Sequence, residues 1–151
     1  MTTKFIAALA LVMVTVFGAA QPGDDPVGFP KEYTGFTQVR TTTVKRDPSH
    51  GTVFANRGPS GMPASYPYGS ILVMEWRRGT GGEIARLDVM RKERGFGASY
   101  GADRNGEWAY ASYSPDGKLL TGPAEALACA QCHLKAGASK DFVFGGPIGG
   151  R

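Results

Sequence analysis

The run Ser70–Arg78, SILVMEWRR, decides the fold, because it is the most apolar strand candidate in the chain. Successive side chains of a strand point to opposite faces of a sheet. The run therefore predicts one face with Leu72, Met74 and Trp76, and another with Ile71, Val73 and Glu75. The first face is wholly apolar, and we expect it to lie inside the protein.

Strand-like sequence continues on both sides of this run. Residues 35–45 are rich in β-branched side chains, residues 51–56 form a short second run, and residues 107–114 alternate aromatic and small side chains. Residues 83–94 fit either a helix or a strand, because their apolar side chains satisfy both spacings. Recurrent glycine and proline predict loops at residues 58–69, and residues 145–151 also have loop-like sequence. The pattern predicts a sheet of short strands.

Composition sets the class of the protein. The chain has 151 residues, of which 42% are hydrophobic and 20% charged. These values are typical of one globular domain and exclude wholesale disorder. The net charge of +4 is spread along the chain without a block of lysine or arginine, so we expect no nucleic-acid partner.

The N-terminus predicts a signal peptide over residues 1–20. Lys4 supplies the positive charge, Phe5–Phe17 is an uncharged apolar run, and small residues precede a cleavage point after Ala20. An uncleaved membrane anchor is the alternative. We expect a mature domain over residues 21–151 that is exported to the periplasm and has no membrane contact.

The two cysteines of the chain lie in one motif, Cys129-Ala130-Gln131-Cys132-His133. This is the pattern of c-type haem attachment. Positions three and four apart share a helix face, so both thiols can reach the two vinyl groups of one porphyrin while His133 ligates the iron. Gly122 as cap and Pro123 at the first helical position predict the helix that carries the motif.

Three other interpretations of the motif compete with haem. A thioredoxin-like redox pair needs a βαβ context, which the sequence lacks. A zinc site needs four ligands, and only His50 is left to help. A plain disulfide explains neither the histidine nor the export sequence. We therefore expect one covalently attached haem c.

Several segments, taken in order, point to a known family. They are Phe29-Pro30-Lys31-Glu32-Tyr33, Gly69–Trp76, Trp108-Ala109-Tyr110 with Pro115-Asp116-Gly117, and Ala128–His133 with Lys140-Asp141-Phe142-Val143-Phe144. Together they span most of the mature chain. In these segments the chain resembles the cytochrome P-460 family, which includes the cytochromes c′-β.

The resemblance implies an α+β fold, with an antiparallel sheet, flanking helices and a haem-bearing helix near the C-terminus. It also implies a homodimer, and a five-coordinate iron with His133 on the proximal side. Some members oxidise hydroxylamine and carry a lysine cross-linked to the haem. Members of the c′-β type lack the cross-link and bind gases such as nitric oxide under an aromatic cap.

The sequence departs from the cross-linked type at Met74, which stands where the family's lysine is expected. No lysine lies between Arg46 and Arg91, so we expect no bond between an amine and the porphyrin. Met74 either packs against the haem or ligates the iron, and we favour packing. Phe36 and Phe54 are candidate caps of the haem pocket, with ordinary core packing as the alternative.

Three functions remain open. The first is binding of a small gas, or redox chemistry on small nitrogen compounds, at an open iron site. The second is enzymatic oxidation of hydroxylamine. The third is electron transfer by a six-coordinate iron, with an unidentified redox partner protein. An apolar distal side favours a neutral diatomic ligand, because burying an unpaired charge is costly.

Overall fold

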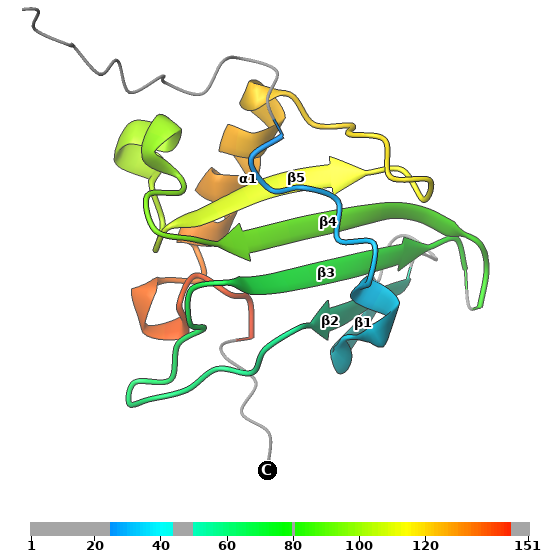
Figure 1. Ribbon diagram of the computed structural model, residues 1–151, viewed down its shortest axis with the longest axis horizontal. Helices are drawn as coiled ribbons and strands as arrows, with labels where there is room; N and C mark the ends of the chain where they lie inside the picture. Colours follow the sequence, from blue (N-terminus) through cyan, green and yellow to red (C-terminus); the bar gives the residue numbers. More distant parts are fainter. Residues whose placement is uncertain (1–24, 44–49, 80, 146–151) are drawn as a thin grey trace, which may run out of the picture.

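A five-stranded antiparallel sheet forms the centre of the protein in a computed structural model, which describes residues 25–43, 50–79 and 81–145. The strands are β1 (Thr37–Thr43), β2 (His50–Ala55), β3 (Ser70–Arg77), β4 (Ile84–Lys92) and β5 (Trp108–Tyr113), side by side in chain order (Figure 1). The described helices are η1 (Tyr33–Gly35), η2 (Ala98–Asp103), α1 (Pro123–Leu134) and η3 (Ala138–Lys140). The predicted α+β class is confirmed.

The ambiguous segment at residues 83–94 is a strand. Leu87 in β4 stands opposite Glu75 of β3 and Tyr113 of β5, so β4 is hydrogen-bonded on both sides. Leu87 and Val89 are both buried on one face of the sheet. The pairing potential of two neighbouring strands outweighs the helical spacing of the same side chains.

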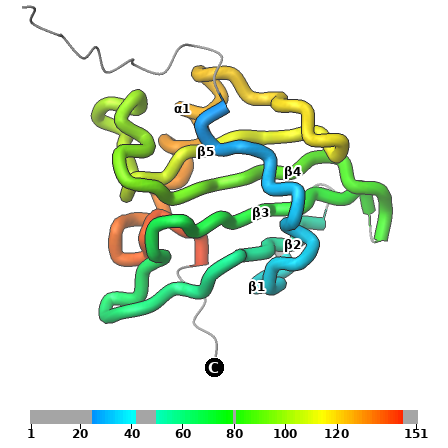
Figure 2. The backbone as a smooth tube through the Cα atoms, viewed as in Figure 1, coloured from blue at the N-terminus to red at the C-terminus, as the bar shows by residue number. Residues whose placement is uncertain are grey.

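The two faces of the sheet are covered by different parts of the chain. The N-terminal segment crosses one face, and α1 lies against the other (Figures 1 and 2). Val73 packs in the core cluster under the N-terminal segment, whereas Leu72 and Met74 belong to the cluster on the side of α1. The predicted division of β3 into two faces is therefore confirmed.

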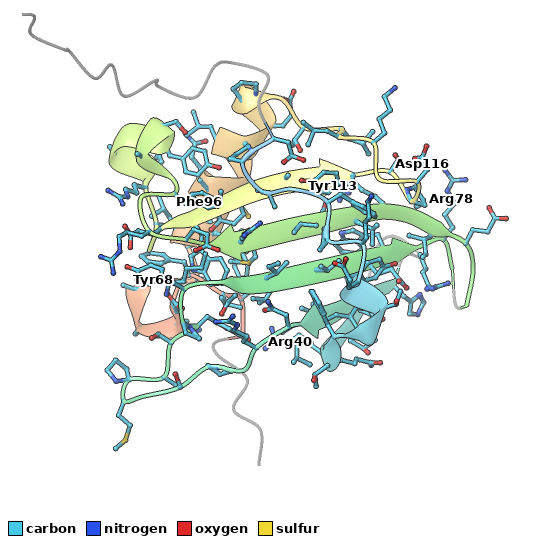
Figure 3. All side chains as sticks on the ribbon, viewed as in Figure 1. Arg40, Tyr68, Arg78, Phe96, Tyr113 and Asp116 are labelled. Atoms are coloured by element: carbon cyan, nitrogen blue, oxygen red, sulfur yellow. The ribbon has the colours of Figure 1, made fainter. Side chains whose placement is uncertain are left out.

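Polar contacts hold the N-terminal segment on its face. The hydroxyl of Tyr113 donates to the carboxylate of Asp25 at 2.7 Å, and Tyr113 lies on the face that this segment crosses (Figure 3). The hydroxyl of Tyr33 donates to Glu75 at 2.9 Å, and Arg77 pairs with the same carboxylate. Burial and the hydrogen bond to Glu75 raise the pKa of Tyr33 to about 12. Glu75 is thus a buried anchor on the face opposite α1.

The start of α1 follows the predicted signals. Pro123 is the first helical residue, where its missing N–H costs no hydrogen bond. The backbone N–H of the capping residue Gly122 donates to the carboxylate of Glu125 at 2.9 Å. These local signals fix where the helix begins and so set the rotation of its later turns, which carry the Cys-x-x-Cys-His motif.

The predicted signal peptide, residues 1–20, lies outside the described residues. Within the described ranges, none of the helices has both the length and the apolar character needed to cross a membrane.

Candidate functional site

A cavity of about 350 Å³ lies between α1 and the sheet, a size in the range of small-molecule and cofactor sites. Most of its lining is apolar or aromatic. The lining residues are Val39, Arg40, Val53, Tyr66, Leu72, Met74, Trp76, Asp88, Val89, Met90, Tyr110, Ala111, Ser112, Cys129, Cys132, His133, Val143 and Phe144.

All three chemically active residues of the motif line this cavity. Cys129 and Cys132 are both free thiols, the first half-buried and the second exposed. Burial is the main cause that raises the pKa of Cys129, and the negative charge of Asp88 adds to it. The structure therefore brings two thiols and one imidazole to the same apolar space, as the sequence predicts.

His133 is held by one short hydrogen bond. Its Nδ1 lies 2.7 Å from the carbonyl oxygen of Phe142, so Nδ1 carries the proton and donates. Burial lowers the pKa of His133, an effect that this hydrogen bond partly offsets. The ring also packs against Tyr110 and Phe144, with centroids 4.8 and 5.2 Å away. The neutral imidazole is left with an unprotonated Nε2, the form in which histidine binds a metal.

Asn105 joins the motif helix to the sheet. Its side chain is fully buried, and its Nδ2 donates to the carbonyl of Ala130 at 2.9 Å. Its Oδ1 accepts from the hydroxyl of Tyr110 at 3.0 Å. Because Ala130 lies between the two cysteines and Tyr110 packs on His133, one side chain fixes both parts of the site.

Asp88 is the only carboxylate among the lining residues of the described cavity, and its oxygens are fully engaged. It forms a salt bridge with Arg86 at 2.8 Å, and its Oδ2 also accepts from Trp76 Nε1 at 2.6 Å. Its Oδ1 accepts from the hydroxyl of Ser112 at 2.6 Å. Both oxygens of this carboxylate are therefore already occupied by donors from three other side chains.

Arg40 enters the cavity lining through an irregularity in β1. The register between β1 and β2 shifts between Gln38 and Arg40, so that Val39 and Arg40 both line the cavity. Such bulges re-aim side chains next to functional sites. The guanidinium donates to the carbonyl of Phe144, and Arg40 lies toward the β1 edge of the sheet (Figure 3).

Of the three pocket candidates from the sequence, the structure places one in the cavity. Met74 lines it, opposite Val53 and Asp88 in the two neighbouring strands. Phe36 and Phe54 do not line it, and the structure places them in ordinary core packing, the alternative that the sequence left open. Both pack in the core cluster on the other face, since Phe54 follows the cavity-lining Val53 and so points away.

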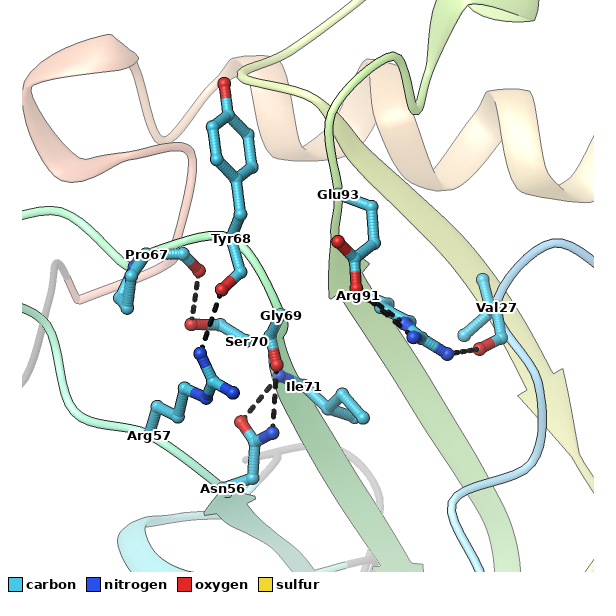
Figure 4. Close-up of polar contacts among 10 residues, drawn as sticks. All are labelled: Val27, Asn56, Arg57, Pro67, Tyr68, Gly69, Ser70, Ile71, Arg91 and Glu93. Atoms are coloured by element: carbon cyan, nitrogen blue, oxygen red, sulfur yellow. Dashed lines mark hydrogen bonds and ion pairs between the residues drawn. The ribbon is translucent and has the colours of Figure 1, made fainter.

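Three other polar side chains lie outside the cavity lining. Arg57 donates to the carbonyl of Tyr68 at 3.1 Å (Figure 4), and Arg77 is paired with Glu75. His50 begins β2 and is not among the cavity-lining residues. Groups of three or more histidine, cysteine, aspartate or glutamate side chains that could hold a metal ion are absent from the described part of the chain.

A family model described as Cytochrome P-460 matches residues 30–145, most of the chain. The chain belongs to the cytochrome P-460 family. No curated protein matches it at a significant level. The match includes all five strands and the motif helix, so the cavity and its lining lie inside the family region.

Membership of the cytochrome P-460 family supports a haem cofactor, and the cavity suits one. The cavity is mostly apolar, and two thiols and a histidine with an unprotonated Nε2 line its wall. Sequence reasoning found these three residues but missed Arg40, Asp88, Asn105 and the Phe142 carbonyl. Arg40 reaches the cavity through an irregularity in β1, and the other three are positioned by contacts between distant segments. Neither feature has a local sequence signal.

Replacing Asn105 by alanine should lower the free energy of unfolding by about 2–4 kcal/mol, because two buried polar groups lose their partner. Urea unfolding measures the change. Asn56 is a matched control, since its side chain also makes two hydrogen bonds, to the backbone of Gly69 and Ile71, but is exposed (Figure 4). Asn56→Ala should cost less than about 1 kcal/mol, because water replaces the lost bonds. Equal losses for the two variants would contradict the role given to Asn105.

Proposed function

We propose that this protein is an exported haem c protein with one covalently attached haem, which binds a small neutral gas such as nitric oxide at an open iron site. The observation that carries the proposal is the convergence of Cys129, Cys132 and His133 on one mostly apolar cavity. When bound, haem supplies an iron centre that takes up diatomic gases and exchanges single electrons.

The cysteines and the histidine of the motif would have different roles in binding the haem. Cys129 and Cys132 would hold the haem covalently, each thiol adding across one vinyl group to form a carbon–sulfur bond, with its proton going to the neighbouring vinyl carbon. The Nε2 lone pair of His133 would provide the proximal ligand, since Nδ1 already donates to the Phe142 carbonyl.

The remaining lining favours a neutral ligand over hydroxylamine chemistry. No lysine is among the residues that line the described cavity, so the cross-link of the hydroxylamine-oxidising members has no donor there. The one carboxylate in the lining, Asp88, already accepts hydrogen bonds from Arg86, Trp76 and Ser112. Hydroxylamine oxidation and redox chemistry on other small nitrogen compounds remain the alternative functions.

Covalent attachment predicts that haem stays with the polypeptide in acidified organic solvent. Cys129→Ala or Cys132→Ala should each leave a single thioether bond, and the double variant should release all its haem. The extraction, followed by the absorbance of each phase, measures this. Free extraction of haem from the native protein would refute covalent attachment.

Met74→Leu should leave the visible spectrum of the holoprotein nearly unchanged. Met74 lines the cavity on a strand held on both sides, and leucine conserves most of its volume. Met90→Leu is the control, because Met90 lines the same cavity from the next strand. A change from a low-spin to a high-spin spectrum in Met74→Leu alone would identify a thioether ligand and favour the electron carrier.

A homodimer is part of the proposal, and the open edge of the sheet supports it. The two edge strands of the sheet are β1 and β5. On β5 the backbone N–H groups of Tyr110 and Ser112 are already used, because they donate to the hydroxyls of Tyr100 and Thr121. Among the described residues, no strand pairs with the outer edge of β1, and such edges commonly pair with another chain.

Light scattering of the mature protein at micromolar concentration should return twice the mass of one chain. Thr41→Lys places a charge on the exposed β1 edge and should shift the mass toward the single chain. A single-chain mass for the native protein would refute the dimer.

A further inference from the structure

The carbonyl that fixes His133 lies on backbone of an uncommon shape. Asp141 and Phe142 have φ values of 51° and 58°, the left-handed region that side chains other than glycine rarely adopt. A bulky residue such as phenylalanine is unusual there, and two such residues in succession persist only when their surroundings hold them. The direction of the Phe142 carbonyl therefore depends on what holds Asp141.

Asp141 is bonded to three separate parts of the chain. Both carboxylate oxygens accept from Lys92 Nζ at 2.8 Å, and one also accepts from the backbone N–H of Tyr66 at 2.7 Å. Its backbone carbonyl accepts from Trp108 Nε1 at 3.0 Å. Strands β4 and β5 and the loop before β3 thus converge on the residue before Phe142.

The pair of Lys92 and Asp141 is buried. The two residues are 9% and 7% exposed, and the ammonium also lies 5.5 Å from the ring centroid of Trp108. Lys92 is the only lysine in the described strands, and it lies outside the lining of the cavity. Buried ion pairs are seldom better for stability than apolar packing, so this pair calls for another role.

We propose that Lys92 and Asp141 are positioning residues for the proximal ligand, a role that rests on the proposed function of His133. The ion pair between them keeps the backbone at Asp141 and Phe142 in the left-handed region. In this conformation the Phe142 carbonyl points at His133 Nδ1. The resulting hydrogen bond fixes the ring orientation and increases the electron density at Nε2. An iron bound at Nε2 would have a stronger bond to histidine and a lower reduction potential.

The test replaces the charged pair by a neutral pair of similar size, Lys92→Met with Asp141→Asn, in the holoprotein. Asparagine tolerates a positive φ and still accepts from the backbone of Tyr66. Resonance Raman of the ferrous form should show the iron–histidine stretching band at lower wavenumber and broader than in the native protein. The reduction potential should rise, and Asp141→Asn alone should give a smaller shift in the same direction.

Glu75→Gln is the matched control, because Glu75 belongs to an ion pair on the opposite face of the sheet, away from His133. It should leave both the band and the potential at their native values while lowering stability. Native values in the double variant, or loss of haem from both Asp141 variants while Glu75→Gln keeps it, would overturn the positioning role. Absence of haem from the native protein would instead refute the proposed function.

Discussion

Successive side chains of a strand point to opposite faces of a sheet, and in this protein different parts of the chain cover the two faces. The N-terminal segment closes one face with ordinary core packing, anchored by the contacts of Asp25 with Tyr113 and of Tyr33 with Glu75. The motif helix α1 crosses the other face and leaves a cavity beneath it. The parity of a side chain in its strand therefore decides whether it packs under the N-terminal segment or in the cluster on the side of α1, where the cavity lies.

That constraint explains which parts of the site could be predicted. The run 70–78 shows its two faces in its sequence, which predicts that Met74 faces the interior, and the structure places Met74 in the cavity lining. The position of Phe54 cannot be predicted in this way. Which face of the sheet Phe54 occupies follows from the pairing of β2 with β3 and not from the short sequence of β2 itself. A clear alternation in a long strand thus predicts its two faces, but a short strand such as β2 does not show which of its side chains face the cavity.

Other features of the site arise between distant segments and have no local pattern. The shift in register at Val39 brings Arg40 to the cavity, and only the pairing of β1 with β2 reveals it. The left-handed backbone at Asp141 and Phe142 depends on Lys92, about fifty residues earlier in the chain. In contrast, the motif Cys129–His133 is local, and a helix with a clear start signal suffices to bring its side chains together.

The visible absorption spectrum of the purified holoprotein, recorded oxidised and reduced, tests the central claim most directly. An open site with His133 as the only protein ligand predicts a five-coordinate, high-spin haem without a cross-link. A red-shifted chromophore would reveal a lysine cross-link. A low-spin spectrum with a thioether-to-iron band in the oxidised state would reveal a second protein ligand, and either result would contradict the account.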